Sequence, residues 1–177
     1  MIELQRWTPA DVPLLLAWVD SPARLVEWAG PAAFTYPLDE GQLLRHLEPA
    51  TGTEPRLLAF RASERQTGDL AGYIELANIQ RDHRSATISR VMVAPHLRGR
   101  GIGTQMVREV LRIGFEELKL HRVGLGVFAH NHSALACYRK AGFVEEGLLR
   151  DNLRMGDAYW SLCLMSVLEH EWRAARS

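Results

Sequence analysis

The chain has 177 residues, of which 47% are hydrophobic and 24% charged, as expected for one globular domain spanning residues 1–177. Lys plus Arg and Asp plus Glu each total 21, so no net charge favours nucleic acid or an anionic membrane. No apolar run approaches the roughly 18 residues of a membrane span, and no signal-peptide pattern opens the chain. Two cysteines, Cys137 and Cys163, are too few for a disulfide framework. We therefore expect a soluble, cytoplasmic protein.

The first half of the chain is predicted to contain two helical stretches and then three antiparallel strands. A short strand over Ile2–Trp7 precedes a helix whose start, Thr8 followed by Asp11, has the capping-box pattern. A second helix is expected at about Asp39–Glu48, where three leucines share one face. The strands are expected at Leu57–Arg61, Leu70–Ile79 and Ser85–Val93.

The second half begins with a glycine-rich turn and an amphipathic helix from Ile102 to about Leu118. A strand over Arg122–Phe128 and a short helix closed by Gly142 follow. The chain is expected to end in a hairpin and a solvated tail at 169–171. Because a strand, a helix and a strand follow one another, a crossover with local parallel pairing is expected. These elements indicate an α/β (α+β) fold with a mixed sheet flanked by helices.

The turn between Val93 and the amphipathic helix predicts an anion site. The first helical N–H groups lack internal partners, and the helix dipole, Arg98 and Arg100 add positive charge. Glycine at Gly101 and Gly103 would let phosphate approach the backbone and would allow positive φ. The dinucleotide and P-loop signatures do not fit the residues after Gly103. Taken alone, the pattern also suits a surface turn.

Arg98, Gly101 and Gly103, placed after a strand, resemble motif A of the GNAT N-acetyltransferase superfamily. A later segment resembles the family's second motif through Asn131, Ala134, Ala136, Tyr138, Gly142 and Phe143. The similarity extends from about residue 57 to 172, and its end is most similar to the ribosomal-protein alanine acetyltransferase branch. It implies one GNAT-type domain whose central sheet is mostly antiparallel but contains a splayed parallel pair, at 91–93 and 124–128.

The resemblance also implies acetyl-CoA as the co-substrate. Backbone N–H groups of 98–104 would hold the pyrophosphate, the edge of 91–93 would pair with the pantetheine amides, and an N–H such as that of Met92 would stabilise the oxyanion. The implied cofactor-binding residues are Val91, Met92, Val93, Arg98, Gly99, Arg100, Gly101, Ile102, Gly103, Thr104 and Asn131. No metal is expected, since His130 and His132 have no third ligand at a persuasive spacing.

Two residues are candidates for catalysis. The resemblance places Tyr138 near the thioester sulfur, where a phenol can protonate the leaving thiolate; the alternative is a tyrosine that packs its helix on the sheet. The glutamate that some relatives carry on the second splayed strand is replaced here by Gly126. Glu75 is the substitute base, with a pKa expected to be raised by desolvation. The alternative is that Glu75 is a structural carboxylate paired with Arg81, Arg84 or Arg90. A water chain could then remove the proton, or the amine could arrive already neutral.

The expected function is transfer of an acetyl group to a primary amine by direct attack in a ternary complex. The acceptor could be a peptide N-terminus, a metabolite amine or an aminoglycoside, and a homodimer is possible. The alternative is a non-catalytic sensor or subunit that binds acyl-CoA.

Overall fold

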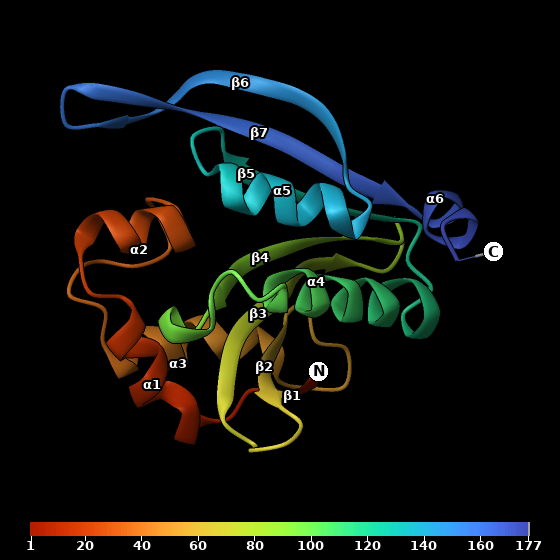
Figure 1. The fold of residues 1–177 in the computed structure, drawn as a ribbon, viewed down its shortest axis with the longest axis horizontal. Coiled ribbons are helices and arrows are strands. Elements are labelled where there is room, and N and C mark those ends of the chain that lie inside the picture. Colours follow the sequence, from red (N-terminus) through yellow and green to blue (C-terminus); the bar gives the residue numbers. More distant parts are fainter. Residues whose placement is uncertain (177) are drawn as a thin grey trace.

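The computed structural model describes residues 1–176, whose seven-stranded sheet has the order β1-β2-β3-β4-β5-β7-β6 (Figure 1). The strands are β1 (Ile2–Arg6), β2 (Leu58–Glu64), β3 (Leu70–Gln80), β4 (Ser85–Val93), β5 (Arg122–Phe128), β6 (Val144–Met155) and β7 (Ala158–Leu168). The helices are α1 (Val12–Trp18), α2 (Pro22–Ala29), α3 (Glu40–Leu47), α4 (Ile102–Arg112), α5 (His132–Ala141) and α6 (Glu169–Ala174). The predicted mixed α/β fold is confirmed.

All neighbouring strands pair antiparallel except β4 and β5. Their parallel ladder consists of the three register pairs from Ser85↔Arg122 to Thr87↔Gly124. Beyond Thr87, β4 keeps its pairing with β3 and β5 keeps its pairing with β7 as far as Phe128. The predicted splay of the parallel pair is therefore present, and it begins in the middle of both strands.

The sheet has a separate apolar cluster on each face. Side chains alternate along β3, so Ile74 and Leu76 pack with α4, while Tyr73 packs with residues of α1, α2 and α3. In the first cluster α4, the helix that connects β4 to β5, lies beside α5 (Figure 1). The second cluster places the three N-terminal helices beside the part of β4 that leads into the glycine-rich turn.

Two helices differ from the expectation. Helix α2 was not among the predicted elements. It begins at Pro22, because Ser21 accepts a hydrogen bond from the amide of Arg24 and proline's fixed φ suits a first turn. The tail expected to be solvated at 169–171 belongs to α6. Its Glu169 pairs with Arg84, and Trp172 is 7% exposed, so α6 packs against the domain.

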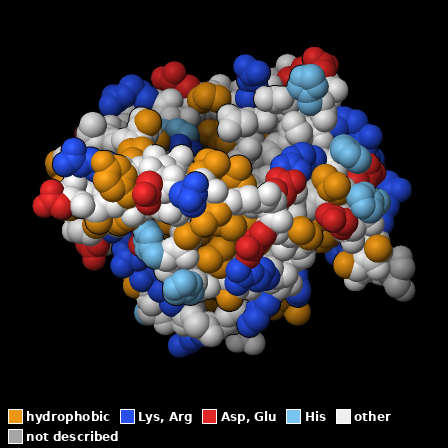
Figure 2. Space-filling model, turned by 90° about the horizontal axis from the view of Figure 1, so that it is seen from above, with side chains coloured by type: hydrophobic (Ala, Val, Ile, Leu, Met, Phe, Trp, Pro, Cys, Tyr) orange, Lys and Arg blue, Asp and Glu red, His pale blue; other side chains and the backbone are white. Residues whose placement is uncertain are grey.

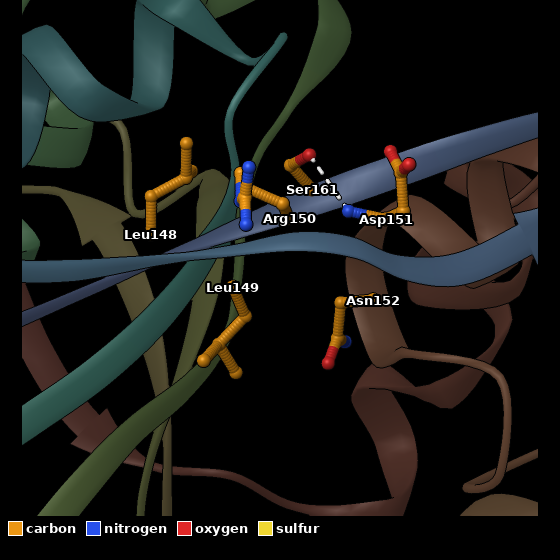
Figure 3. Close-up of a pocket in the computed structure, with 6 residues that line it drawn as sticks. All are labelled: Leu148, Leu149, Arg150, Asp151, Asn152 and Ser161. Atoms are coloured by element: carbon orange, nitrogen blue, oxygen red, sulfur yellow. Dashed lines mark hydrogen bonds between the residues drawn. The ribbon is translucent and has the colours of Figure 1, made fainter.

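The β6–β7 hairpin extends past the rest of the sheet (Figure 1). Its face, seen from above in Figure 2, shows apolar side chains between charges of both signs, and Val144, Leu148 and Leu149 are exposed. An open hollow runs along the hairpin, and the amide of Asp151 donates to Ser161 Oγ at 3.1 Å there (Figure 3). None of the site residues predicted from the sequence lines this hollow.

Candidate active site

The turn after β4 has the backbone expected of an anion-binding loop. Gly99 and Gly101 have φ of 75° and 76°, in the left-handed region that favours glycine. A methyl group added at either residue would meet no atom within 4 Å, so the space beside the turn is open. The amide of Gln105 bonds back to the carbonyl of Gly101, which leaves the amides of 102–104 as the free first turn of α4.

The positive φ expected for Gly103 is not found. This residue lies within α4 and is not among the glycines with positive φ. A Cβ at Gly103 would lie 3.3 Å from Sγ of Cys137 on α5. Glycine at this position therefore allows the close approach of α4 and α5, whereas Gly99 and Gly101 shape the turn.

Helix α2 lies close to the turn and to the start of α5. Partial burial and the guanidinium of Arg24 lower the pKa of Arg98, and Asp20 and Glu27 act in the opposite direction. Arg98 also donates from Nε to the carbonyl of Val93 at 3.3 Å. Asn131 Nδ2 donates to Glu27 Oε1 at 3.3 Å. The charges of Arg98 in the turn and of Arg24 on α2 thus repel each other, and a bound anion would relieve this repulsion.

A β-bulge interrupts β4 beyond the point where it leaves β5. Tyr73 pairs with Met92 and Glu75 pairs with Ser89, so β4 has one more residue than β3 between these two pairs. Within this extra stretch Arg90 has φ of 49°. In a regular strand neighbouring side chains point to opposite faces, but here both Ser89 and Arg90 reach the same carboxylate. The bulge therefore turns an additional side chain toward the face covered by α1, α2 and α3.

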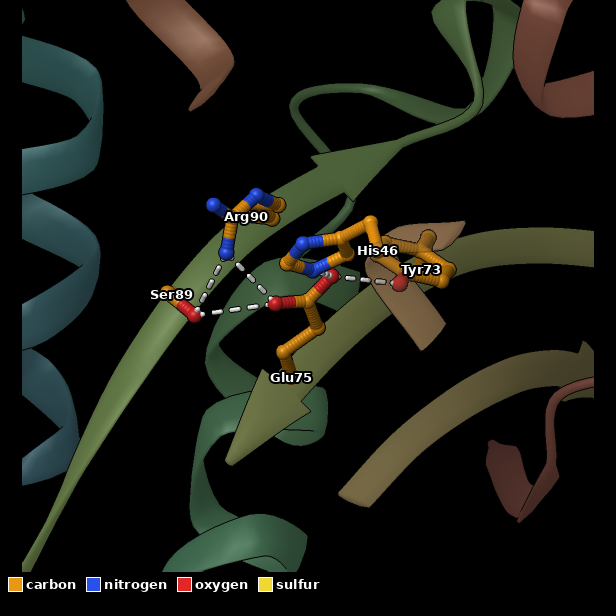
Figure 4. Close-up of polar contacts among 5 residues, drawn as sticks. All are labelled: His46, Tyr73, Glu75, Ser89 and Arg90. Atoms are coloured by element: carbon orange, nitrogen blue, oxygen red, sulfur yellow. Dashed lines mark hydrogen bonds and ion pairs between the residues drawn. The ribbon is translucent and has the colours of Figure 1, made fainter. Parts of the chain in front are cut away.

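That carboxylate belongs to Glu75, which is fully buried and accepts four hydrogen bonds (Figure 4). Its Oε1 accepts from the Tyr73 hydroxyl at 2.5 Å and lies 3.0 Å from His46 Nε2. Its Oε2 accepts from Ser89 Oγ at 3.1 Å and from Arg90 Nη1 at 2.7 Å. Of the three arginines considered as partners of Glu75 from the sequence, Arg90 is the one that pairs with it.

The expectation that the pKa of Glu75 is raised is wrong. Burial alone would raise it, but the hydrogen bond from His46, the charge of Arg90 and the hydrogen bond from Tyr73 together hold the pKa of this carboxyl below its usual range. Glu75 is therefore ionised at neutral pH, and all its contacts support the charged form. A carboxylate in this state is a weak base but a strong orienting group for the groups that donate to it.

Aromatic rings surround this cluster. Trp7 and Trp28 contact Tyr73 edge-on, with ring centroids 4.7 Å and 5.9 Å away, and Phe34 stacks on Trp28. The indole N–H groups of Trp7 and Trp28 and Nε of Arg90 are buried without a partner among residues 1–176. Buried donors are normally paired, so this face has unused capacity to bind oxygen atoms.

Tyr138 lies on α5, on the other side of the splayed pair. Its side chain is 9% exposed, and its ring meets Phe143 edge-on at 5.8 Å. Burial raises the pKa of Tyr138, so its phenol is protonated at neutral pH. Asn131 caps the same helix by accepting from the amide of Ala134 at 3.1 Å.

The family model for the GNAT acetyltransferases matches residues 23–143, which is more than half of the chain. The chain belongs to the GNAT acetyltransferase family. The match includes α2 and α3, although the resemblance seen in the sequence began only near residue 57.

Curated GNAT relatives have different acceptors in their names. A putative ribosomal N-acetyltransferase, YdaF, of Bacillus subtilis is 34% identical over 62% of this chain and 59% of its own length. The spermidine N(1)-acetyltransferase of Escherichia coli K12 is 31% identical over 60% of this chain and 57% of its own length. The chain therefore matches about three fifths of the length of these relatives.

Solved structures show the same GNAT fold. The spermidine N-acetyltransferase of Vibrio cholerae in complex with CoA and spermine has a TM-score of 0.84 at 23% identity, with 97% of this chain and 98% of that chain covered. A second structure, a point mutant of the Vibrio cholerae enzyme, gives a TM-score of 0.80 at 23% identity over 99% of both chains. At this identity the likeness establishes the arrangement of the elements.

Sequence reasoning missed His46 as part of the site. The helical pattern placed this residue on the second helix, but its contact with Glu75 joins positions 29 residues apart. Only the docking of α3 on β3 brings them together. Within residues 1–176 no group of three or more His, Cys, Asp or Glu side chains could hold a metal, and no helix is long and apolar enough to cross a bilayer.

Proposed function

We propose that this chain is an acetyl-CoA-dependent N-acetyltransferase that moves the acetyl group to a primary amine by direct attack in a ternary complex. The observation that carries the proposal is the turn at Gly99–Gly101, open and left-handed, at the start of α4 and beside a splayed parallel pair in a GNAT chain. Residues 1–177 would act as one domain, and the unpaired Cys137 and Cys163 fit a cytoplasmic location.

The donor would bind along β4 and the turn. The free first-turn amides of α4 and the charge of Arg98 and Arg100 suit a pyrophosphate. The edge of β4 that has left β5 offers backbone groups to the pantetheine amides, and the amide of Met92 is our candidate for the oxyanion donor. The proposed cofactor-binding residues are Val91, Met92, Val93, Arg98, Gly99, Arg100, Gly101, Ile102, Gly103, Thr104 and Asn131.

Tyr138 is the proposed acid that protonates the departing thiolate, a role supported by its protonated, buried phenol on α5. Glu75 remains the second proposed catalytic residue. Its ionised state and its four donors favour an orienting role over direct proton abstraction.

The acceptor is proposed to enter on the face of α1, α2 and α3, where the aromatic rings and the unused donors lie. A peptide N-terminus, a metabolite amine and an aminoglycoside are the classes to compare, and the names of the relatives add spermidine and ribosomal protein. A homodimer through the C-terminal strands fits the exposed Val144, Leu148 and Leu149 of β6.

The test combines calorimetry with CoA and a thiol-release assay over these amines. Gly101→Val forces a β-branched residue into φ of 76° at the turn, while Gly156→Val does the same at φ of 61° in the β6–β7 turn. Both variants lose stability, by about 1–2 kcal/mol. We expect Gly101→Val alone to lose CoA affinity, at least tenfold. Unchanged CoA affinity in Gly101→Val would remove the turn from the proposal.

A non-catalytic acyl-CoA sensor is the second candidate, because β5 carries Gly126 where a carboxylate would be expected in some relatives. CoA binding without thiol release for any amine in the panel favours this candidate over the enzyme.

A further inference from the structure

We propose that His46 is the general base of the acetyl transfer and that Glu75 holds its imidazole in the reactive orientation. The inference rests on the proposed function and deepens it, because it names the group that receives the proton from the acceptor amine. Three observations carry it: the contact between the two side chains, the free nitrogen of the imidazole, and the position of both residues at the β-bulge of β4.

The contact fixes the tautomer of His46. Glu75 is ionised and can only accept, so His46 Nε2 carries the hydrogen and donates it across 3.0 Å to Oε1. In the neutral imidazole the other ring nitrogen, Nδ1, then has a lone pair, and it has no hydrogen-bond partner within residues 1–176. The side chain is 20% exposed, and Nδ1 is not among the buried atoms of residues 1–176 that lack a partner, so solvent reaches this nitrogen. Glu75 thus orients the imidazole through Nε2 and leaves Nδ1 as the basic nitrogen.

The other groups around Glu75 cannot take this role. Burial and the charge of Glu75 raise the pKa of Tyr73 well above its usual range, so its hydroxyl remains a donor. Arg90 is a permanent cation, and Ser89 is a weak base. The charged or titratable groups that face His46 are therefore Tyr73 and Glu75 from β3 and Arg90 from β4. Its own helix adds Arg45 and is followed by Glu48.

The position of the pair matches the place where an acetyl group would react. Glu75 pairs in register with Ser89, and Tyr73 pairs with Met92, so the cluster spans the bulge in the part of β4 that has separated from β5. Figure 4 shows the His46 ring lying over β3 and beside Arg90 on β4, close to that bulge. Phe34 contacts the ring edge-on at 5.2 Å and holds it against this face.

The lone pair of the neutral amine forms a C–N bond with the thioester carbon, and the C–S bond breaks. Nδ1 of His46 takes one proton from the nitrogen as it becomes positive, which leaves an amide and an imidazolium stabilised by Glu75. Tyr138 gives its proton to the sulfur, and solvent returns the imidazolium proton to the phenolate. The products are the acetylated amine and free CoA.

The decisive variants are His46→Gln and His46→Ala. A glutamine amide can still donate to Glu75 but cannot accept a proton, so His46→Gln separates catalysis from packing. We expect turnover at saturating acetyl-CoA to fall at least about a hundredfold in both variants while CoA affinity is retained. Added imidazole restores turnover to His46→Ala and not to His46→Gln, where the glutamine side chain occupies the site. His170→Gln, an exposed position on α6, keeps the parent turnover.

The pH profile supplies an independent readout. We expect the acid limb of the kcat/KM profile of the parent to contain an inflection that is absent in His46→Gln. Turnover of His46→Gln within threefold of the parent overturns the role of His46, and so does an unchanged inflection. The proposed function itself fails if the parent shows neither CoA binding nor thiol release. The two failures are therefore distinguishable.

Discussion

Removing the Glu75 carboxylate should destabilise the protein far more than removing a surface carboxylate. Glu75→Ala takes away the common acceptor of four hydrogen bonds and leaves Arg90, whose side chain is 15% exposed, as a nearly buried charge. Loss of one partner of a buried ion pair costs about 3–5 kcal/mol. Nε of Arg90 already lacks a partner among residues 1–176, and the guanidinium would keep only a long contact with Ser89 Oγ at 3.4 Å and the ring of Phe34 at 5.5 Å.

The measurement is urea unfolding followed by circular dichroism at neutral pH. Since domains have total stabilities of about 5–15 kcal/mol, the loss would be a large fraction of the total. Each kcal/mol shifts the Tm of a domain of this size by roughly 2–4 °C, so Glu75→Ala should melt about 6–20 °C below the parent.

The matched control removes a surface ion pair. Glu117 is 55% exposed and bonds Arg112 at 2.9 Å, so Glu117→Ala should cost no more than about 1 kcal/mol. If Glu75→Ala loses as little as this control, the buried cluster does not stabilise the fold, and the reasoning about its electrostatics is wrong.

Two further outcomes concern other parts of the sheet. A Cβ at Gly72 would lie 2.6 Å from Met106 Sδ and 2.7 Å from the carbonyl of Met92; Gly72→Ala should therefore cost about 1–3 kcal/mol in urea unfolding, and a neutral result would contradict the close approach. Hydrogen bonds from Arg122 and Ser166 lower the pKa of Glu146 from 4.5 to about 2. The contribution of ionised Glu146 to stability is thus complete above pH 4.5 and is lost as the pH falls toward 2. In Glu146→Gln the unfolding midpoint should therefore depend less on pH in that window. An unaltered pH dependence would assign the loss of stability to other carboxylates.

The strands beside the site could be predicted from local pattern. Both β4, at Ser85–Val93, and β5, at Arg122–Phe128, begin and end where the sequence indicated. Alternating apolar residues bounded by polar turns are a local signal, and the glycine-rich turn marks the end of β4. The splay followed from the resemblance to a family, since no spacing in the sequence reports where a parallel ladder stops.

The chemistry of the buried cluster could not be predicted in the same way. Glu75 alternates with apolar residues along β3, and burial, the only local signal, predicts a raised pKa. Four donors from three elements reverse that direction, and their convergence depends on the β-bulge and on the docking of α3. The start of α2 did have a usable signal, the Ser21–Pro22 pair, which suits the cap and first position of a helix.

The short ladder between β4 and β5 has a consequence for the kinetics of donor binding. Three register pairs and the antiparallel partners on either side, β3 and β7, fix the positions of the two strands where their ladder ends. The proposed donor, acetyl-CoA, therefore binds to a preorganised gap between β4 and β5, and no interstrand hydrogen bond has to break when it binds. Association should follow a single phase whose rate rises in proportion to donor concentration, without the plateau that a slow opening step would impose.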